Sequence, residues 1–262
     1  RSHCDWSSDV CSSDLYELLG GPVKPDIPVY ASALHPVGAE KVQAEAKAYV
    51  EEGYQAMKMR FPYGPGHGIA GMRANEEHVA NVRDAVGDDI EIMADAYMGW
   101  DFLYAKKMVK RLEPYRLAWL EEAFLPDDLN SYAKLRQETS IPISGGEHEY
   151  TRFGFQQIIE KQAMDIIQPD LRRCGGLSEG RRICSLALAN GITVIPHAYG
   201  PTHIHFALAE TAVPMIEYFP IPSWDDLPDA EVEPLFHDEP HPQQGPVTAS
   251  VDRQSVVYAK CI

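Results

Sequence analysis

The sequence has no run of apolar residues long enough to cross a membrane. A transmembrane helix needs about 18 or more consecutive apolar residues, and no stretch of this 262-residue chain approaches that length. The first residues also lack the apolar centre of a secretory signal peptide. We therefore expect a soluble, cytoplasmic protein without a membrane partner.

Cysteine is scarce, and basic residues are scarce relative to acidic ones. The 5 cysteines form no C-x-x-C pair and are odd in number, which fits neither a disulfide framework nor a structural zinc site. Lys and Arg total 23 against 39 Asp and Glu, so the formal net charge is −16. That field repels a phosphate backbone, and we expect no nucleic-acid partner. An anionic substrate would need local compensation from a divalent cation and a few placed basic side chains.

The two ends of the chain differ in composition from its middle. Residues 1–15, RSHCDWSSDVCSSDL, are rich in Ser, repeat the pattern S-S-D and lack a helical or strand period, so we interpret them as a non-native leader. Residues 225–262 are rich in Pro and acidic side chains, which predicts an irregular C-terminal tail. The segment 16–224 between them is predicted to be a single catalytic domain.

Within this middle segment, strand-like runs alternate with helical patterns. The runs are IPVYAS (27–32), YQAMKMRF (54–61), IEIMADA (90–96), LAWLEEA (117–123), IPISGGE (141–147), MDIIQPD (164–170), ITVIPHA (192–198) and PMIEYF (214–219). Eight short strand and helix units predict an α/β fold, a (β/α)8 barrel of the TIM type with little inserted sequence. A doubly wound open sheet is the alternative, because alternation alone does not prove closure.

A polar residue closes each of the last six runs. These residues are Asp95, Glu121, Glu147, Asp170, His197 and Glu217. The active site of a β/α barrel is built at the carboxyl ends of its strands, so these side chains are predicted to meet at one mouth. Any one acid alone could be a helix cap or a solvated loop residue, but six in consecutive units favour a shared site.

Crowded carboxylates at this mouth call for a cation. Acids in one small cavity repel one another unless a metal ion or raised pKa values let them coexist. Oxygen-only ligation by Asp95, Glu121 and Glu147 suits Mg²⁺. Glu122 follows Glu121 directly, and strand alternation predicts that it faces away from the mouth, behind the ligands or in a salt bridge.

Asp170 and His197 close neighbouring strands and form a candidate catalytic pair. A carboxylate can hold the Nδ1–H of an imidazole and leave Nε2 as a base of suitable pKa. His148 follows a predicted metal ligand directly and is a candidate for substrate contact. The glycine-rich segment 64–71 is predicted to be a mobile loop over the site, with His67 touching the substrate.

A zinc-dependent hydrolase of the amidohydrolase kind is a competing interpretation. His203-Ile204-His205 has the spacing of a zinc pair. Enzymes of that class carry H-x-H on the first strand, whereas the first strand-like run here ends in Ala31-Ser32, so the competing interpretation is the weaker one.

The polar motifs together resemble the barrel domain of the enolase superfamily, in its mandelate racemase subgroup. The motifs are the third-strand Asp, W-L-E-E-A, G-E-H-E, Q-P-D and I-P-H. GGEHEYTRFGF and DIIQPDLRRCGG, within residues 145–176, are most similar to acid-sugar dehydratases of the L-rhamnonate dehydratase type. The resemblance covers about 30–219. It also implies an N-terminal α+β capping domain, which we expect this chain to lack, and a homo-oligomer at full length.

The resemblance implies roles for the predicted residues. Mg²⁺ on Asp95, Glu121 and Glu147 would hold a carboxylate substrate while the α-proton is removed. His197, oriented by Asp170, would be the base and would then protonate the departing 3-hydroxyl. Glu217 would hydrogen-bond the substrate carboxylate or the enediolate. The products would be a 2-keto-3-deoxy sugar acid and water.

The second strand discriminates between dehydratases and racemases of this subgroup. Racemases have K-x-K there, with the second Lys as a base opposite the His, whereas this chain has Lys58-Met59-Arg60. Arg stays protonated and is a poor base, so one competent base remains. We therefore predict a dehydratase in which Lys58 and Arg60 bind the substrate carboxylate. A racemase or epimerase, or a truncated barrel without turnover, stays open.

Overall fold

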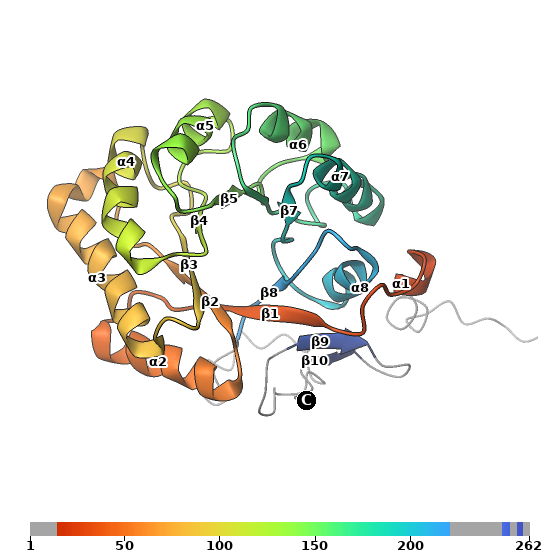
Figure 1. Cartoon of the computed structure of the whole chain (residues 1–262), viewed down its shortest axis with the longest axis horizontal. Helices are drawn as coiled ribbons and strands as arrows, with labels where there is room; N and C mark the ends of the chain where they lie inside the picture. Colours follow the sequence, from red (N-terminus) through yellow and green to blue (C-terminus); the bar gives the residue numbers. More distant parts are fainter. Residues whose placement is uncertain (1–14, 221–247, 252–255, 259–262) are drawn as a thin grey trace, which may run out of the picture.

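Parallel strands and helices alternate along the chain as the sequence predicts. The computed structural model describes residues 15–220, 248–251 and 256–258, and the chain curls into a ring with the strands inside and the helices outside (Figure 1). The ring strands are β1 (Ile27–Ser32), β2 (Ala56–Arg60), β3 (Glu91–Asp95), β4 (Trp119–Glu121), β5 (Ile143–Gly145), β6 (Ile166–Ile167), β7 (Thr193–Val194) and β8 (Ile216–Tyr218). The helices are α1 (Leu15–Leu18), α2 (Ala39–Glu52), α3 (Gly68–Val86), α4 (Phe102–Leu112), α5 (Leu129–Glu138), α6 (Thr151–Glu160), α7 (Leu177–Ala189) and α8 (Pro201–Ala209), with 3-10 turns η1 (Pro65–His67) and η2 (Glu113–Tyr115).

The strands pair in chain order and in parallel. β1 pairs with β2, and each strand pairs with the next as far as β7, while β8 pairs with β1. Within the described ranges, β7 and β8 share no strand ladder, so the ring has one seam there. A doubly wound sheet reverses its strand order at a switch point, whereas this order does not reverse. The predicted barrel is therefore confirmed.

Capping side chains account for where two helices begin. Asp101 precedes α4, and its carboxylate accepts a hydrogen bond of 2.8 Å from the amide of Tyr104. Asp128 caps α5 in the same way through the amide of Ser131, at 3.1 Å. These caps satisfy amides that lack a partner in the first turn of a helix. No described helix is both long and apolar enough to span a membrane.

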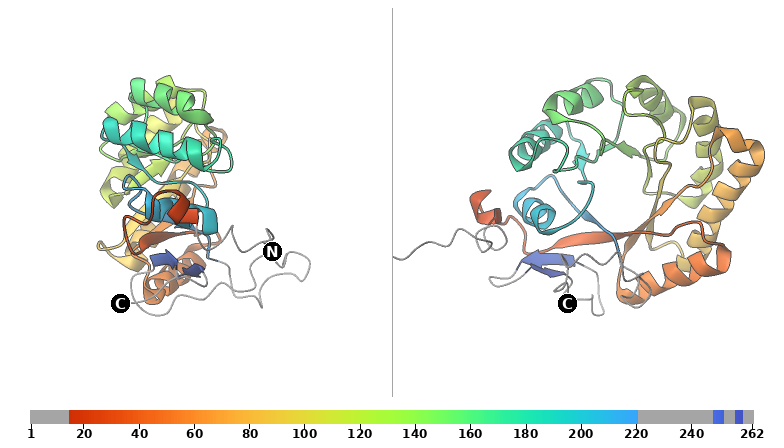
Figure 2. Two further views of the ribbon diagram at one scale, coloured as in Figure 1. Left: turned by 90° about the vertical axis from the view of Figure 1, so that its right-hand side faces the viewer. Right: turned by 180° about the vertical axis from the view of Figure 1, so that it is seen from behind.

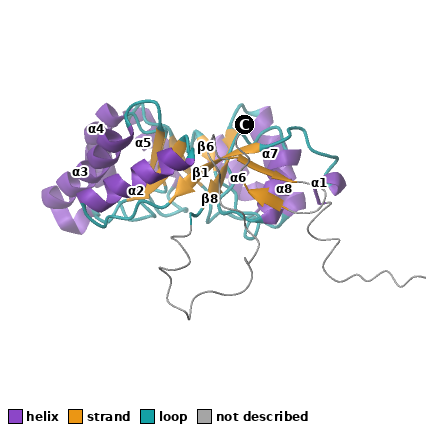
Figure 3. Cartoon of the chain, turned by 90° about the horizontal axis from the view of Figure 1, so that it is seen from below, coloured by secondary structure: helices purple, strands orange, loops and turns teal. Residues whose placement is uncertain are grey.

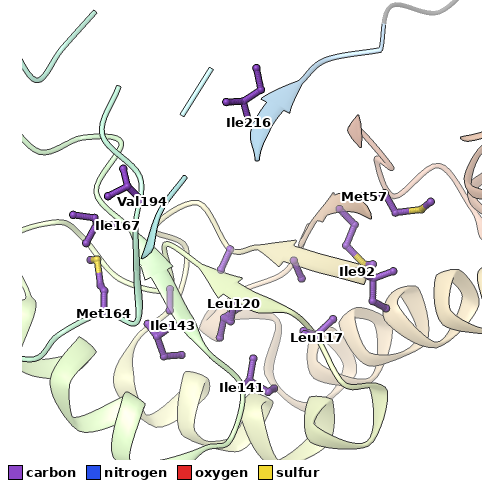
Figure 4. Close-up of a cluster of buried hydrophobic side chains, with 14 of the residues drawn as sticks. Met57, Ile92, Leu117, Leu120, Ile141, Ile143, Met164, Ile167, Val194 and Ile216 are labelled. Carbon is purple, nitrogen blue, oxygen red and sulfur yellow. The ribbon is translucent and has the colours of Figure 1, made fainter. Parts of the chain in front are cut away.

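The core lies mainly between the strands and the surrounding helices. One side chain from most strands contributes to it, among them Met57, Ile92, Leu120, Ile143, Ile167, Val194 and Ile216 (Figure 4). Seen from below, α3 and α4 lie at one end of the molecule and α8 at the other, with strands between them (Figure 3). A layer of helices packed on strands is the usual solution for burying both faces of a parallel sheet.

Part of the C-terminal segment that we expected to be irregular forms strands. β9 (Thr248–Val251) and β10 (Val256–Tyr258) pair with each other, and β9 pairs antiparallel with β1 through Ile27 and Ala249. Both lie beside β1 in the view from behind (Figure 2). The prediction of an irregular tail was wrong for these residues, because acidic and Pro-rich composition hid two short β-branched runs. Residues 1–14 and 221–247 lie outside the described part, so the domain limits stay predictions.

Candidate active site

The interior of the barrel changes from apolar to charged along the strands. One level of inward-facing residues forms a buried apolar cluster that contains Tyr30, Ala56, Met93, Trp119 and Ile195. Two positions further along the chain are Ser32, Lys58, Asp95, Glu121 and His197. Because alternate residues of a strand share a face, this second set lies above the apolar level, at the carboxyl ends of the strands. The predicted mouth therefore exists.

Lys58 is a buried cation between two carboxylates. Its side chain is 1% exposed, and its Nζ donates to Glu121 and lies 2.9 Å from Oε1 of Glu217. Burial opposes the charge, but the two carboxylates outweigh it and raise the pKa of Lys58 well above its usual range. Burial likewise opposes the charge of Glu217, yet Lys58 and His197 lower the pKa of Glu217 to about 2. The Lys58–Glu217 pair is therefore permanently ionised at neutral pH.

Asp95 lies beside this pair and is held by Arg60. Nη1 of Arg60 donates to Oδ2 of Asp95 at 2.8 Å, and the guanidinium lies over the ring of Tyr97. The amide of Tyr97 donates to Oδ1 of Asp95 at 2.7 Å. Burial and the neighbouring Glu121 nevertheless raise the pKa of Asp95 to about 7, against the attraction of Lys58 and Arg60. The negative charge on this side exceeds what the two cations neutralise.

His197 and Asp170 form the predicted pair. Nδ1 of His197 lies 3.2 Å from Oδ2 of Asp170, while its Nε2 lies 3.4 Å from Oε2 of Glu147 and 3.8 Å from Oε2 of Glu217. Burial lowers the pKa of His197, but the hydrogen bond to Asp170 and the charges of Glu217 and Glu147 outweigh it, so the pKa is raised. Burial opposes the charge of Asp170 too, but hydrogen bonds from His197 and the amide of Arg172 lower its pKa. The side chain of His197 is 14% exposed, and its Nε2 faces the carboxylates of Glu147 and Glu217.

Glu122 faces the mouth, and the prediction that it faces away was wrong. The residue has a left-handed backbone conformation with φ of 40°, which interrupts strand alternation directly after β4. Its two carboxylate oxygens lie 3.0 Å from Nδ1 of His148. Burial, Glu121 and Asp95 raise the pKa of Glu122 to about 8. The contact is a hydrogen bond rather than the expected ion pair, because burial also lowers the pKa of His148.

The carboxylates of the mouth suit a hard cation, although the predicted ligands are not gathered into one group. In the described part of the chain, the one set of three whose ligand atoms all lie within 4.8 Å of one another is Glu122, Glu147 and His148. Asp95 and Glu121 are instead engaged by Arg60 and Lys58. Burial raises the pKa of Glu147 as well, with His197 opposing the shift. Buried oxygen donors with surplus negative charge are the chemistry that Mg²⁺ accepts.

The predictions for His67 and for the glycine-rich segment around it differ from the structure. His67 lies exposed on η1, where its ring packs against Tyr63 with centroids 5.0 Å apart, and no contact seen in the described residues joins it to the carboxylates. The glycine-rich segment around it is not a long loop but η1 followed by the first turn of α3. A Pro at the second position of this segment favours the start of a helical turn.

The zinc pair of the competing interpretation does not form. His203 and His205 are both buried on α8, but the first lies toward Asp170 and the second stacks on Tyr16 with ring centroids 5.2 Å apart. Residues two apart on a helix do not face each other. The strand ends that a metal hydrolase would need are occupied by the carboxylate cluster instead.

Sequence reasoning missed several partners of the predicted residues. Nε2 of Gln168 and Nε1 of Trp119 each donate to Oε2 of Glu121 at 2.8 Å. Arg173 lies 3.7 Å from Asp170 and 4.0 Å from Glu147. Counting two residues back from Asp170 and Glu121 along their strands would have found Gln168 and Trp119, because residues at that spacing share the inward face.

Comparison with known proteins agrees with the barrel fold. Residues 41–252 match the family model described as enolase C-terminal domain-like. An L-rhamnonate dehydratase of Saccharopolyspora erythraea is 35% identical over 243 residues, which cover 92% of this chain and 60% of that protein. The chain thus spans about 60% of the length of the curated relatives that it matches.

Solved structures share the barrel. A rhamnonate dehydratase from Gibberella zeae, complexed with Mg, superposes with a TM-score of 0.71 at 34% identity, over 80% of this chain and 50% of that chain. A racemase from Streptomyces coelicolor with bound magnesium has a TM-score of 0.72 at 26% identity, over 79% of this chain and 60% of that chain. Both a dehydratase and a racemase are therefore among the structural relatives.

Proposed function

The chain belongs to the enolase C-terminal domain-like family, and we propose that its barrel performs the Mg²⁺-dependent dehydration of an acid sugar, an aldonate similar to L-rhamnonate. The observation that carries the proposal is the asymmetry of the mouth. His197 is a partly exposed base held by Asp170, whereas Lys58 is buried and ionised between two carboxylates. One base on one face supports elimination rather than two-sided proton exchange.

Asp95, Glu121 and Glu147 would hold the metal, with Glu122 adding negative charge beside them. Divalent binding there is supported by the raised pKa values of Asp95, Glu147 and Glu122, since each reflects burial first and then neighbouring carboxylates without enough positive charge. When bound, the ion supplies positive charge against the negative charge that develops on the substrate carboxylate. Arg60 and Lys58 would compete for the same carboxylates, so their contacts would loosen on metal binding.

His197 would transfer the protons of the reaction. Nε2 would accept the proton from the carbon next to the substrate carboxylate, and the electron pair of that C–H bond would form the enediolate. Asp170 would keep Nδ1 protonated and stabilise the imidazolium. The same imidazolium would then protonate the 3-hydroxyl as its C–O bond breaks, releasing water and an enol that becomes the 2-keto-3-deoxy acid.

The substrate would be positioned by four side chains, those of Glu217, Lys58, Arg60 and His148. Glu217 is ionised, so it would accept a hydrogen bond from a substrate hydroxyl rather than donate one. Arg60 is 32% exposed and offers guanidinium N–H groups at the edge of the mouth. Nδ1 of His148 contacts Glu122, so Nε2 is the atom that would contact the substrate. His67 is not part of this proposal, because its contacts lie elsewhere.

The proposal is tested by turnover of a panel of acid sugars with Mg²⁺ and detection of 2-keto-3-deoxy acids. Replacing the base, His197→Asn, should reduce kcat by about 10²- to 10⁴-fold while Mg²⁺ affinity measured by calorimetry stays unchanged. Unchanged turnover in this variant would refute the assignment of the base. Solvent deuterium entering the α-position without elimination would indicate a racemase, and Mg²⁺ binding without any turnover would indicate a barrel that is not competent by itself.

A further inference from the structure

A cavity lies beside the mouth, between the segments that follow β6 and β7. Its volume is about 290 Å³, and it is lined by residues 171, 172 and 176 of the loop after β6 and residue 177 at the start of α7, and by residue 200 and the first turn of α8, residues 201–203. None of the predicted metal, base or substrate residues lines it. The two loops are nevertheless the ones that carry Asp170 and His197.

Two helices begin at this cavity. α7 starts after Gly176 and α8 after Gly200, and neither glycine provides a side-chain cap. Both glycines have positive φ, 83° and 129°, in the region that side chains with a Cβ rarely adopt. The first amides of a helix lack intrahelical partners and carry partial positive charge. Pro201 has no amide hydrogen, so the contribution of α8 comes from Thr202.

His203 provides an independent sign of a missing partner. Its side chain is 1% exposed and lines the cavity, yet neither Nδ1 nor Nε2 has a hydrogen-bond partner among the residues that the structure describes. Its nearest ionic neighbour is Oδ1 of Asp170, 3.9 Å from Nε2 and beyond hydrogen-bond distance. Buried polar groups are nearly always paired. Burial also lowers the pKa of His203 to about 4 despite Asp170, so the ring is neutral at pH 7.

Arg172 lines the cavity beside the start of α8. Its Nη2 donates to the carbonyl of Tyr199 at 3.1 Å and lies 3.6 Å from the position that a Cβ on Gly200 would take. The guanidinium therefore lies at the start of α8. The acidic residue in the first turn of α7, Glu179, is already paired with Arg152 and Arg182. An incoming anion would thus meet positive charge from Arg172 and from two helix starts.

We propose that this cavity binds a tetrahedral oxyanion, namely phosphate or a phosphoryl group. First-turn amides of α7 and α8 and the guanidinium of Arg172 would donate hydrogen bonds to its oxygens, as helix starts commonly do for phosphate. A neutral imidazole has one donor and one acceptor, and a phosphate that retains a proton offers both in return, unlike chloride or a carboxylate. Occupancy would tie together the two loops that carry Asp170 and His197.

The test is binding of inorganic phosphate to the full chain, by calorimetry and ³¹P NMR, in a chelator at constant ionic strength set with chloride. No sugar or divalent ion is present, so the result is independent of the proposed dehydratase activity. We expect saturable binding that Arg172→Gln weakens by about tenfold or more. The matched control is Arg73→Gln, which removes the same charge from an exposed position on α3 and should leave the affinity nearly unchanged.

Two outcomes overturn the proposal. The first is the absence of saturable phosphate binding, or equal affinity in the Arg172 and Arg73 variants. The second is loss of binding in Arg60→Gln with binding retained in Arg172→Gln, which would place the anion in the mouth. In the unmodified chain, phosphate should also shift the imidazole ¹H–¹⁵N signals of His203. This readout does not depend on a buried variant that could fail to fold.

The source of the phosphoryl group is resolved by a second ligand. If a small phosphomonoester binds about tenfold more tightly than inorganic phosphate, the occupant is a phosphorylated organic molecule. If the two bind equally, the cavity takes the free ion. Either result supports the proposal, and neither alters the outcomes that would overturn it.

Discussion

The two sides of the mouth are built from similar residue types but behave differently. On the side of β2 to β4, Lys58 and Arg60 are paired with carboxylates, and the Lys58 contacts are fully buried. On the side of β5 to β7, His148 and His197 are partly exposed, and Glu147 lies between them. Around Lys58 the first side holds charge in place through buried ion pairs, whereas the second side presents two partly exposed imidazoles at the mouth.

The largest expected effect comes from breaking the fixed side. Lys58→Met leaves Glu121 and Glu217 buried without their shared cation, and removal of one partner from a buried ion pair costs about 3–5 kcal/mol of unfolding free energy. Urea denaturation of the metal-free chain measures the loss. The double variant Lys58→Met with Glu217→Gln should recover part of it, since one buried charge is removed. A loss below about 1 kcal/mol would mean that water reaches this layer.

The next largest effect belongs to the side of β5 to β7. Asp170→Asn keeps the size of the side chain but removes the charge that stabilises protonated His197, and we expect kcat to fall by about 10²-fold or more. Stability should change less than in Lys58→Met, because Asn keeps the volume of this buried residue and can still accept the hydrogen bond from the amide of Arg172. Steady-state kinetics and urea denaturation on the same preparation separate the two quantities. A similar fall in both would show that Asp170 acts as a fold residue like Lys58.

The pH dependence of stability tests how completely charge is balanced on the side of β2 to β4. Asp95 and Glu122 have pKa values raised to about 7 and about 8 by burial near other carboxylates. The native state therefore keeps protons that the unfolded chain releases above its ordinary carboxyl pKa values, and stability should fall as pH rises from 5 to 8. The slope is about 1.4 kcal/mol per pH unit for each proton kept.

His197 acts in the same direction, because its raised pKa gives stability below the unfolded value that is lost as pH rises through the folded one. Glu217 acts in the opposite direction, but only at acidic pH, since its pKa is lowered to about 2. Added Mg²⁺ should flatten the slope between pH 5 and 8 by favouring the ionised carboxylates. Urea midpoints with and without Mg²⁺ measure this, and a rise in stability over that range without metal would contradict it.

The sequence was sufficient for the barrel and for the positions that close its strands. Strand alternation places Met93 and Asp95 on the same inward face, and likewise Trp119 and Glu121. An apolar run that ends in an acid therefore predicts both a strand and an acidic side chain at the mouth. The rule failed where the backbone left the strand geometry. The positive φ of Glu122 turns its side chain toward the mouth. A glutamate gives no sequence signal for a left-handed backbone conformation.

Other features depended on tertiary contacts that local patterns do not encode. The pairing of β9 with β1 joins residues from the two ends of the chain. The contact of Lys58 with both Glu121 and Glu217 joins β2 to two strands far along the sequence. Charge balance predicted that basic residues were needed at the mouth, but only the packed barrel determines which carboxylate each one meets.

The smallest expected effect is at the surface and provides the reference for Lys58. Lys106 on α4 pairs with Glu138 at 2.7 Å, with side chains 47% and 34% exposed. Water already solvates both groups, so Lys106→Met should change the unfolding free energy by less than about 1 kcal/mol, although it removes the same kind of ion pair. Added salt should weaken the Lys106 pair and leave the Lys58 pair unaffected, because screening acts on exposed charges. Equal losses of unfolding free energy in Lys106→Met and Lys58→Met would show that burial does not explain the strength of the Lys58 pairs.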